Sequence, residues 1–323
     1  MEKMRKKGYL YLIFISVLLL LAGCQGTGTK QPVKVGTFFG GTDGVSISFV
    51  EIFPPTKLDQ NDIVPVKVLL ENKGEYDLVA GAVKAKIFGV NLNAFSLSGN
   101  YIATKGTLIG KSEGSFIGGK QEINFGNLHY TIPVTNSEDF TLRARVCYPY
   151  QTKGIINVCL KSAISKEAGE GVCNLEGEKV GGKDKKSGAK GSVSAGPIQI
   201  TSVTEQTRGS DEIRFDIKIE NKGKGDVYSP ESICDELEDD VKRLEKRDQV
   251  EIEVLNPGDV RCRFITGDES NKGIVSLNKG IGTISCFKKV QDTIEDKLSI
   301  NVNYVYIDSA SKQITIFQSS NTR

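Results

Sequence analysis

The sequence predicts an all-β protein in which antiparallel strands pack into sandwiches. Apolar residues alternate with other residues over long stretches, as in Leu298, Ile300, Val302, Tyr304 and Tyr306, which would share one face of an extended strand. Alternation with a period of two indicates half-buried strands, and the turn residues between the runs favour antiparallel sheets. Comparable runs occupy residues 45–53, 62–71, 78–88, 139–148, 155–160, 198–206, 212–220, 249–255, 259–265, 281–287 and 312–317.

Residues 1–23 predict an export signal. A basic start at residues 3–7 precedes an apolar run from Tyr9 to Leu21, which is too short to cross a ~30 Å hydrocarbon core comfortably. The run ends in Leu21-Ala22-Gly23-Cys24, which resembles the lipobox of prokaryotic lipoproteins. The resemblance implies cleavage before Cys24, lipid on its thiol, and a body held at the extracytoplasmic face of the membrane. The alternative is a signal-anchor helix with an incidental cysteine.

Cleavage would also change the charge of the chain. The full sequence has a net charge of +2, and residues 1–23 hold four cations (Lys3, Arg5, Lys6, Lys7) and one acid (Glu2), a net +3, which leaves the mature chain at −1. Nearly balanced charge implies no strong field for nucleic acid, so we expect no nucleic-acid partner. Residues 24–35 are expected to form a flexible tether.

An internal echo suggests two related domains. An alternating run leads into Glu71-Asn72-Lys73-Gly74, and a second leads into Glu220-Asn221-Lys222-Gly223. A strand that ends in Asn-x-Gly and turns back resembles the Ig-like modules of the CARDB type on prokaryotic surfaces, and the whole arrangement resembles multi-Ig lipoproteins of archaea. The resemblance implies Ig-like sandwiches at residues 36–161 and 197–323. Residues 162–196, rich in glycine, lysine and serine, are expected to be a solvated linker, or alternatively a contact for anionic headgroups or wall polymer.

One short helix is expected in the second domain. Ser229 can cap it and Pro230 can occupy its first position. Its apolar stripe would comprise Ile233, Leu237, Val241 and Leu244. The acidic residues between 235 and 240 are interpreted as a solvated face, because their spacing does not make a calcium loop.

The six cysteines besides Cys24 predict disulfides, because their number is even and the chain is expected to be exported. Cys147 and Cys159 flank Gln151-Thr152-Lys153-Gly154 symmetrically, so a hairpin there would place them opposite each other. Cys262 and Cys286 share faces with core residues and would pair through a sandwich core. Cys173 and Cys234 would then tie the linker to the helix. No C-x-x-C pair exists and the chain has one histidine, so neither a metal site nor a cofactor is expected.

Two patterns resemble catalytic motifs without their context. Gly110-Lys111-Ser112-Glu113-Gly114 fits G-x-S-x-G, but no helix is expected after Ser112 and the sole histidine, His129, lies in a strand-like stretch. With Gly106, the same residues also fall one residue short of a phosphate-binding loop. Glu122 and Glu138 could in principle act as the two acids of a glycosidase, but nothing in the sequence places them together. We therefore assign no catalytic residue, and a secreted cell-envelope hydrolase, serine- or carboxylate-based, is the alternative.

The function predicted from the sequence is that of a lipid-anchored, non-catalytic binding or structural protein of the adhesion type. Its partners would be the membrane, through the lipid, and an unknown surface protein or envelope polymer. The candidate binding surface is the connection from Val90 to Ile102, where apolar residues sit in a long loop. These residues are Phe95, Leu97, Tyr101 and Ile102, and the alternative is that they cap the core of their own domain.

Overall fold

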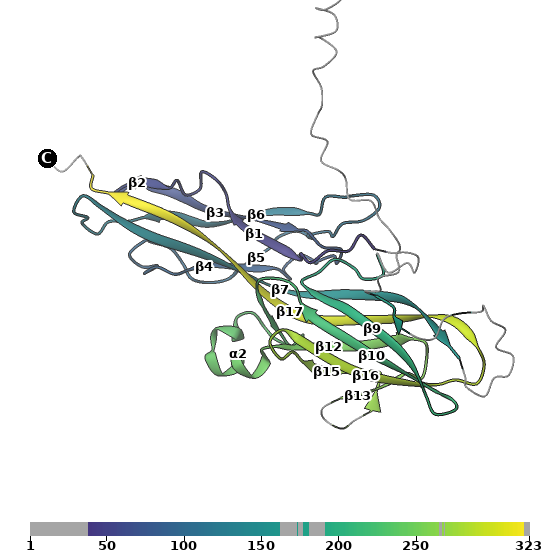
Figure 1. The fold of residues 1–323 in the computed structure, drawn as a ribbon. Coiled ribbons are helices and arrows are strands. Elements are labelled where there is room, and N and C mark those ends of the chain that lie inside the picture. The colour runs from purple at the N-terminus through teal and green to yellow at the C-terminus, as the bar shows by residue number, and fades with distance from the viewer. Residues whose placement is uncertain are drawn as a thin grey trace, which may run out of the picture. The chain divides into compact units, whose positions relative to one another are not determined.

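The computed structural model describes residues 38–161, 173, 177–180, 191–264, 267 and 269–319. These residues form antiparallel sheets with very little helix, which confirms the predicted all-β class (Figure 1). The predicted signal peptide, the tether 24–35 and the lipidation site Cys24 lie outside the described residues. All described residues belong to the compact unit Lys34–Arg323.

Every predicted run overlaps a strand, but the ten-residue strand β6 lies outside them, and the runs 139–148 and 155–160 belong to the single strand β7. The first half of the described chain holds β1 (Val45–Phe49), β2 (Lys57–Asp59), β3 (Ile63–Asn72), β4 (Lys84–Phe88), β5 (Ile102–Ala103), β6 (Lys120–His129) and β7 (Ser137–Leu160). The second half holds β8 (Gly177–Glu178), β9 (Ile198–Arg208), β10 (Glu212–Asn221), β11 (Asp226–Tyr228), β12 (Gln249–Asn256), β13 (Arg261–Arg263), β14 (Glu269–Ser270), β15 (Lys272–Ser276), β16 (Ile281–Lys289) and β17 (Ile294–Phe317).

The strands form three sheets. One contains β1, β3 and β6, and a second runs in the order β14-β13-β16-β10-β9-β8. The third follows the path β15-β12-β17-β7-β4-β5, with β11 and β2 also paired to β17. Among the described strands, only β2 runs parallel to its partner, β17.

The two long strands β7 and β17 connect the halves of the molecule (Figure 1). They pair along their whole length, with Ser137 opposite Phe317 and Leu160 opposite Ile294. The N-terminal part of β7 pairs with β4, whereas the N-terminal part of β17 pairs with β12. Each long strand therefore starts in its own half and continues into the sheet of the other half.

The expected hairpin at residues 151–154 is wrong, because these residues lie within β7 and pair with β17. Gly154 was interpreted as a turn residue, but its role is close packing. A Cβ at this position would meet Ile200 Cδ1 at 2.7 Å. A glycine inside a strand often marks such a close approach.

Part of the expected linker is ordered. Residues 192–196 are buried against β7, with Ile155 N donating to Ser192 O and Ser194 N to Lys153 O, each at 2.8 Å. Gly196 packs closely here, since a Cβ at this position would meet Thr152 Oγ1 at 2.7 Å. Within the same expected linker, β8 pairs with β9. A composition that resembles a solvated linker here allows close packing instead.

Four buried tyrosines occupy the middle of the β7–β17 ladder. Tyr148 lies opposite Tyr306 and Tyr150 opposite Tyr304, with ring centroids 6.0 Å apart in both pairs. Burial raises the pKa of Tyr148 and of Tyr304 well above the ordinary value, which keeps both hydroxyls neutral. These rings fill the core where the halves meet.

The two Asn-x-Gly turns, at residues 72–74 and 221–223, form equivalent hydrogen bonds to these tyrosines. Asn72 Oδ1 accepts from Gly74 N at 3.1 Å and from the Tyr150 hydroxyl at 3.4 Å. Asn221 Oδ1 accepts from Gly223 N at 3.1 Å and from the Tyr306 hydroxyl at 3.2 Å. The Asn-x-Gly echo in the sequence therefore marks two corresponding turns, each joined to the long strand of its own half.

The helix is shorter than expected. A 3₁₀ turn, η1 (Glu236–Glu238), precedes α2 (Asp240–Lys246), so the start predicted at Ser229 and Pro230 is wrong. Asp239 caps α2, because its Oδ1 accepts from Val241 N at 2.9 Å and Lys242 N at 3.0 Å. Of the expected stripe only Leu237 is buried, while Ile233, Val241 and Leu244 are exposed. In the described part of the chain, no helix has the length and apolar character to cross a bilayer.

Candidate functional site

The connection 90–102 supplies core residues rather than an open binding surface. Phe95 is 1% exposed, and its ring centroid lies 4.8 Å from that of Tyr130 and 4.9 Å from that of Phe140. Leu97 is buried in the same core, whereas Ile102 is exposed in β5. For Phe95 and Leu97, the structure therefore supports the alternative that these residues cap the core of their own domain. Tyr101 is half-buried and belongs to a different cluster, described below.

The residues of the catalytic patterns have separate surroundings. Ser112 lies in a tight loop and exchanges two main-chain hydrogen bonds with Ser115, and the next element along the chain is the strand β6. His129 ends β6 opposite Ile63. Glu122 forms an ion pair with Lys67 at 3.8 Å, and Glu138 lies in β7, where its charge and hydrogen bond raise the pKa of Tyr130 beyond the effect of burial. A nucleophile elbow requires a helix after the serine, and this chain has a strand there.

All six cysteines that the sequence assigned to disulfides are paired, but two of the three pairings differ from the prediction. Cys262–Cys286 is confirmed, with the two residues opposite each other in β13 and β16. The other bonds are Cys147–Cys234 and Cys159–Cys173, with Cα–Cα distances of 5.9 and 5.6 Å.

The predicted Cys147–Cys159 and Cys173–Cys234 bonds are therefore wrong. Cys147 and Cys159 lie on one continuous strand, where twelve residues span about 40 Å, and a disulfide needs Cα atoms within about 7 Å. Without a hairpin to bring these cysteines together, Cys159 pairs with Cys173 in the nearby segment, and Cys147 becomes available to Cys234.

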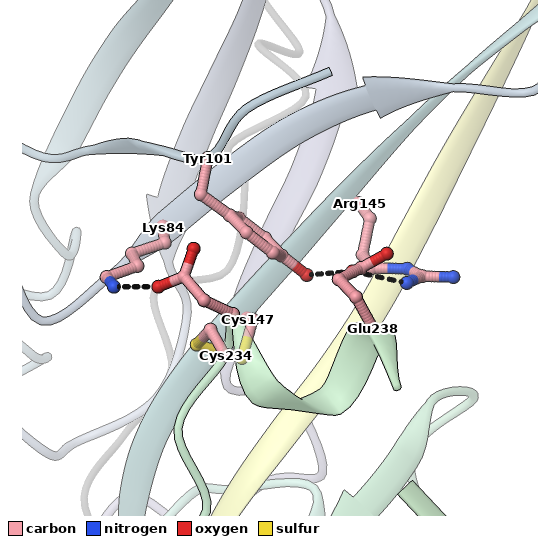
Figure 2. Close-up of a disulfide and its surroundings, with 7 residues drawn as sticks. Lys84, Tyr101, Arg145, Cys147, Cys234 and Glu238 are labelled. Atoms are coloured by element: carbon pink, nitrogen blue, oxygen red, sulfur yellow. Dashed lines mark hydrogen bonds and ion pairs between the residues drawn. A yellow bond between two sulfur atoms is a disulfide. The ribbon is translucent and has the colours of Figure 1, made fainter. Parts of the chain in front are cut away.

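The surroundings of Cys147–Cys234 form a polar cluster that joins the two halves (Figure 2). We call it the clamp and define it by the disulfide together with Lys84, Lys86, Tyr101, Arg145, Asp235 and Glu238.

Strand register places the clamp residues of the first half on one face. Lys84 lies opposite Cys147, and Lys86 lies opposite Arg145, in the pairing of β4 with β7. Because side chains two residues apart point to the same face of a sheet, all four project from one face of β4 and β7. The alternation of β7 indicated this already, since Cys147 falls on the face opposite Phe140, Leu142, Ala144 and Val146.

Glu238 of η1 is the centre of the clamp. Its Oε1 accepts hydrogen bonds from the Tyr101 hydroxyl and from Arg145 Nη1, each at 2.9 Å (Figure 2). Its Oε2 accepts a hydrogen bond from Lys86 Nζ at 2.9 Å. Beside it, Lys84 Nζ lies 2.5 Å from Asp235 Oδ2. The acidic run interpreted as a solvated face therefore contains two residues that pair with the first half.

The electrostatics keep Glu238 ionised. Partial burial alone would raise its pKa, but hydrogen bonds from Lys86 and Tyr101 and the charges of Lys86 and Arg145 outweigh burial and lower the pKa. Burial, followed by the charge of Glu238, raises the pKa of Tyr101. Tyr101 is thus a neutral donor to a carboxylate over the working pH range of most proteins.

The contacts of the clamp join the two halves, and its cysteines and carboxylates are all occupied by these contacts. Its cysteines are oxidised, and its carboxylates are matched by cations. Within the described part of the chain, no three histidine, cysteine or acidic residues gather as metal ligands would. In the chain-entropy model, a disulfide that closes a loop with a sequence separation of 87 contributes about 4–5 kcal/mol. The partly exposed ion pairs add at most about 1 kcal/mol each.

Comparisons with known proteins give little guidance. No family model and no curated protein matches the chain. Among solved structures, the secreted serine protease VesC from Vibrio cholerae matches at 8% identity over 83% of this chain and 51% of that chain, with a TM-score of 0.20. The CupB6 tip adhesin from Pseudomonas aeruginosa matches at 8% identity over 87% of this chain and 100% of that chain, with a TM-score of 0.18. The chain thus spans about half of the VesC chain, and likeness at these TM-scores carries no argument about function.

Proposed function

We propose that this protein is a lipid-anchored, extracytoplasmic binding or structural protein of the adhesion type, without catalytic activity. The observation that carries the proposal is the fastening of the two halves by the 24-residue β7–β17 ladder and the Cys147–Cys234 bond. Three disulfides in the described body support an oxidising compartment, where such bonds persist.

The mechanism would be display of a rigid body. Lipid on Cys24 would hold the chain at the membrane, and residues 24–35 would give reach. A partner that pulls on the far part of the body loads the contacts between the halves. The β7–β17 ladder distributes that force over many main-chain hydrogen bonds. The disulfide of the clamp adds a covalent bond, which resists force better than hydrogen bonds do.

The anchor is tested by Cys24→Ser. We expect the variant to lose the lipidated mass in intact mass spectrometry and to leave the membrane fraction. A variant that keeps both properties would contradict lipid anchoring. The non-catalytic part of the proposal would fail if an activity-based serine probe labelled Ser112 in the full chain.

The fastening is tested by a double variant, Cys147→Ala with Cys234→Ala. The lost loop constraint of about 4–5 kcal/mol should increase proteolytic cleavage around η1 and α2 under native conditions. The matched control is Cys159→Ala with Cys173→Ala, whose bond has a sequence separation of 14 and contributes about 3 kcal/mol. If the first variant were cleaved around η1 and α2 no faster than the control, the clamp would not hold the halves together.

A further inference from the structure

A second polar site lies on the six-stranded sheet, whereas the clamp residues of the first half lie in β4 and β7 of the eight-stranded sheet. Two hollows of ≈ 430 Å³ and ≈ 440 Å³ lie there, each within the ~300–1,000 Å³ typical of ligand pockets. Asp259, Arg261 and Glu269 line both hollows. The two hollows are therefore neighbours, and we call them together the groove.

The groove is rich in cations because of strand register. Arg261 of β13 lies opposite Phe287 of β16, and two residues further along β16, Lys289 lies opposite Glu212 of β10, which in turn lies opposite Arg208 of β9. These side chains share the outer face of the sheet. Neighbouring strands are about 4.8 Å apart, so the main chains of β13 and β9 lie about 14 Å apart, with β16 and β10 between them. The cations of the groove therefore come from several strands, as suits a short chain ligand rather than one ion.

An aromatic ring organises two of the arginines. The guanidinium carbons of Arg208 and Arg263 lie 5.0 and 5.4 Å from the Phe287 ring centroid. Arg208 also pairs with Glu212 at 3.6 Å, and Arg263 pairs with Glu269 at 3.4 Å. These contacts preorient the donors of the groove before any ligand arrives.

Two cations have their charge available. Among the described residues, Arg261 and Lys289 have no ion-pair partner, and both are exposed. An arginine fork can bind a carboxylate through two hydrogen bonds, and a lysine supplies a flexible point charge. The groove therefore has free cationic groups on neighbouring strands.

Acceptors alternate with these donors. Glu212, Asp259 and Glu269 line the same groove, and Asp259 has no ion-pair partner among the described residues. A polyphosphate has no hydroxyl donors for these acceptors, so it would leave Asp259 unmatched. A sugar that carries both carboxylates and hydroxyl groups matches the pattern, because its hydroxyls donate to the acids and its carboxylates accept from Arg261 and Lys289.

We propose that the groove binds an acidic oligosaccharide, a short glycan that contains uronate carboxylates. The site adds a ligand class to the proposed display function and does not depend on the lipid anchor. Two adjoining hollows, cations from β9, β13 and β16, and interleaved acceptors all favour several sugar units bound along the face of the sheet.

Titration calorimetry on the full chain in detergent tests the proposal, with tetragalacturonate as the probe. We expect binding that weakens as salt rises, no comparable binding of neutral maltotetraose, and weaker binding of polyphosphate and polyglutamate. Arg261→Gln with Lys289→Gln should weaken tetragalacturonate binding roughly tenfold or more, because two charge-assisted hydrogen bonds are lost. The control, Lys57→Gln with Lys105→Gln, makes the same charge change outside the six-stranded sheet and should bind as wild type.

Asp259→Gly separates sugar recognition from simple charge attraction. Asp259 has a left-handed φ of 58°, which glycine adopts without strain. Loss of an acceptor for sugar hydroxyls should weaken tetragalacturonate binding. The proposal is overturned if this variant binds tetragalacturonate more tightly, if Arg261→Gln with Lys289→Gln binds as wild type, or if polyphosphate or polyglutamate binds best. None of these results bears on Cys24, so failure of the groove and failure of the anchor are distinguishable.

Discussion

Glu205 in β9 tests how the segment around Lys179, between the two halves, is held against β7 and β9. Its side chain is 0% exposed. Its two carboxylate oxygens accept from Cys159 N at 3.0 and 3.1 Å, and Oε2 lies 3.1 Å from Lys179 Nζ. Burial raises the pKa of Glu205 to about 7, against the opposing effects of Cys159 N and Lys179. Glu205→Gln keeps the shape and an acceptor oxygen but does not ionise.

The direction of the pH effect follows from this raised pKa. Between the ordinary value of 4.5 and about 7, the folded protein binds the proton more strongly than the unfolded chain. The protonated form thus contributes stability that is complete below pH 4.5, falls as pH rises towards 7, and is absent above it. A shift of roughly 2.5 pKa units corresponds to about 3 kcal/mol in the free energy of unfolding.

Denaturant unfolding from pH 5 to pH 8 measures this effect. The wild type should lose about 2–3 kcal/mol relative to Glu205→Gln over that range, because only the wild type has the carboxyl group that titrates there. Glu220→Gln is the control, since hydrogen bonds from Lys218 and Lys222 lower the pKa of Glu220 to about 2, outside the range. Parallel profiles for the wild type and Glu205→Gln, or a wild type that gains stability with pH, would refute the reasoning.

Two further predictions concern the echoed turn and its neighbour. Asn72→Ala should lower the free energy of unfolding in urea by about 3 kcal/mol, because Asn72 is fully buried and its removal leaves Tyr76 O and Leu108 O without this donor. Asn221 is only half-buried, so Asn221→Ala should lower it by about 1–2 kcal/mol. Equal costs would contradict the difference in burial. Gly118→Ala should lower the free energy of unfolding by about 3 kcal/mol or more, because its Cβ would meet Asn72 O at 1.7 Å, while Gly114→Ala enters open space and should change it by less than about 0.5 kcal/mol. Equal melting temperatures for the two alanine variants would contradict the packing at Gly118.

The sequence predicts local features of this fold well. The alternating runs at 198–206, 212–220 and 281–287 correspond to β9, β10 and β16, because alternation reports which face of a strand is buried. The pairing Cys262–Cys286 is predictable for the same reason, since both residues share the core-facing parity of their strands. Local periodicity thus identifies strands and faces, but not how far a strand continues.

Non-local features escape such reasoning. Gly154 has the residue type of a turn, but it lies inside β7, where the Ile200 side chain packs over it, and this contact depends on a residue that is distant in sequence. The clamp joins Lys86 to Glu238 across a long stretch of sequence, and nothing in the pattern around either residue specifies the other. The acidic run resembles a solvated helix face because its partners come from strands of the first half.

Because β7 and β17 pair along their whole length, the two halves on either side of residues 161–197 should not fold separately. The C-terminal part of β7 finds its strand partner in β17, and the C-terminal part of β17 pairs with the part of β7 that lies in the first half. Residues 36–161 and 197–323, expressed separately, would each expose a long unpaired strand edge, which promotes aggregation. Size-exclusion chromatography should show aggregation of each half alone and a 1:1 complex on co-expression. Two soluble, separately folded halves would mean that each long strand can fold back within its own half.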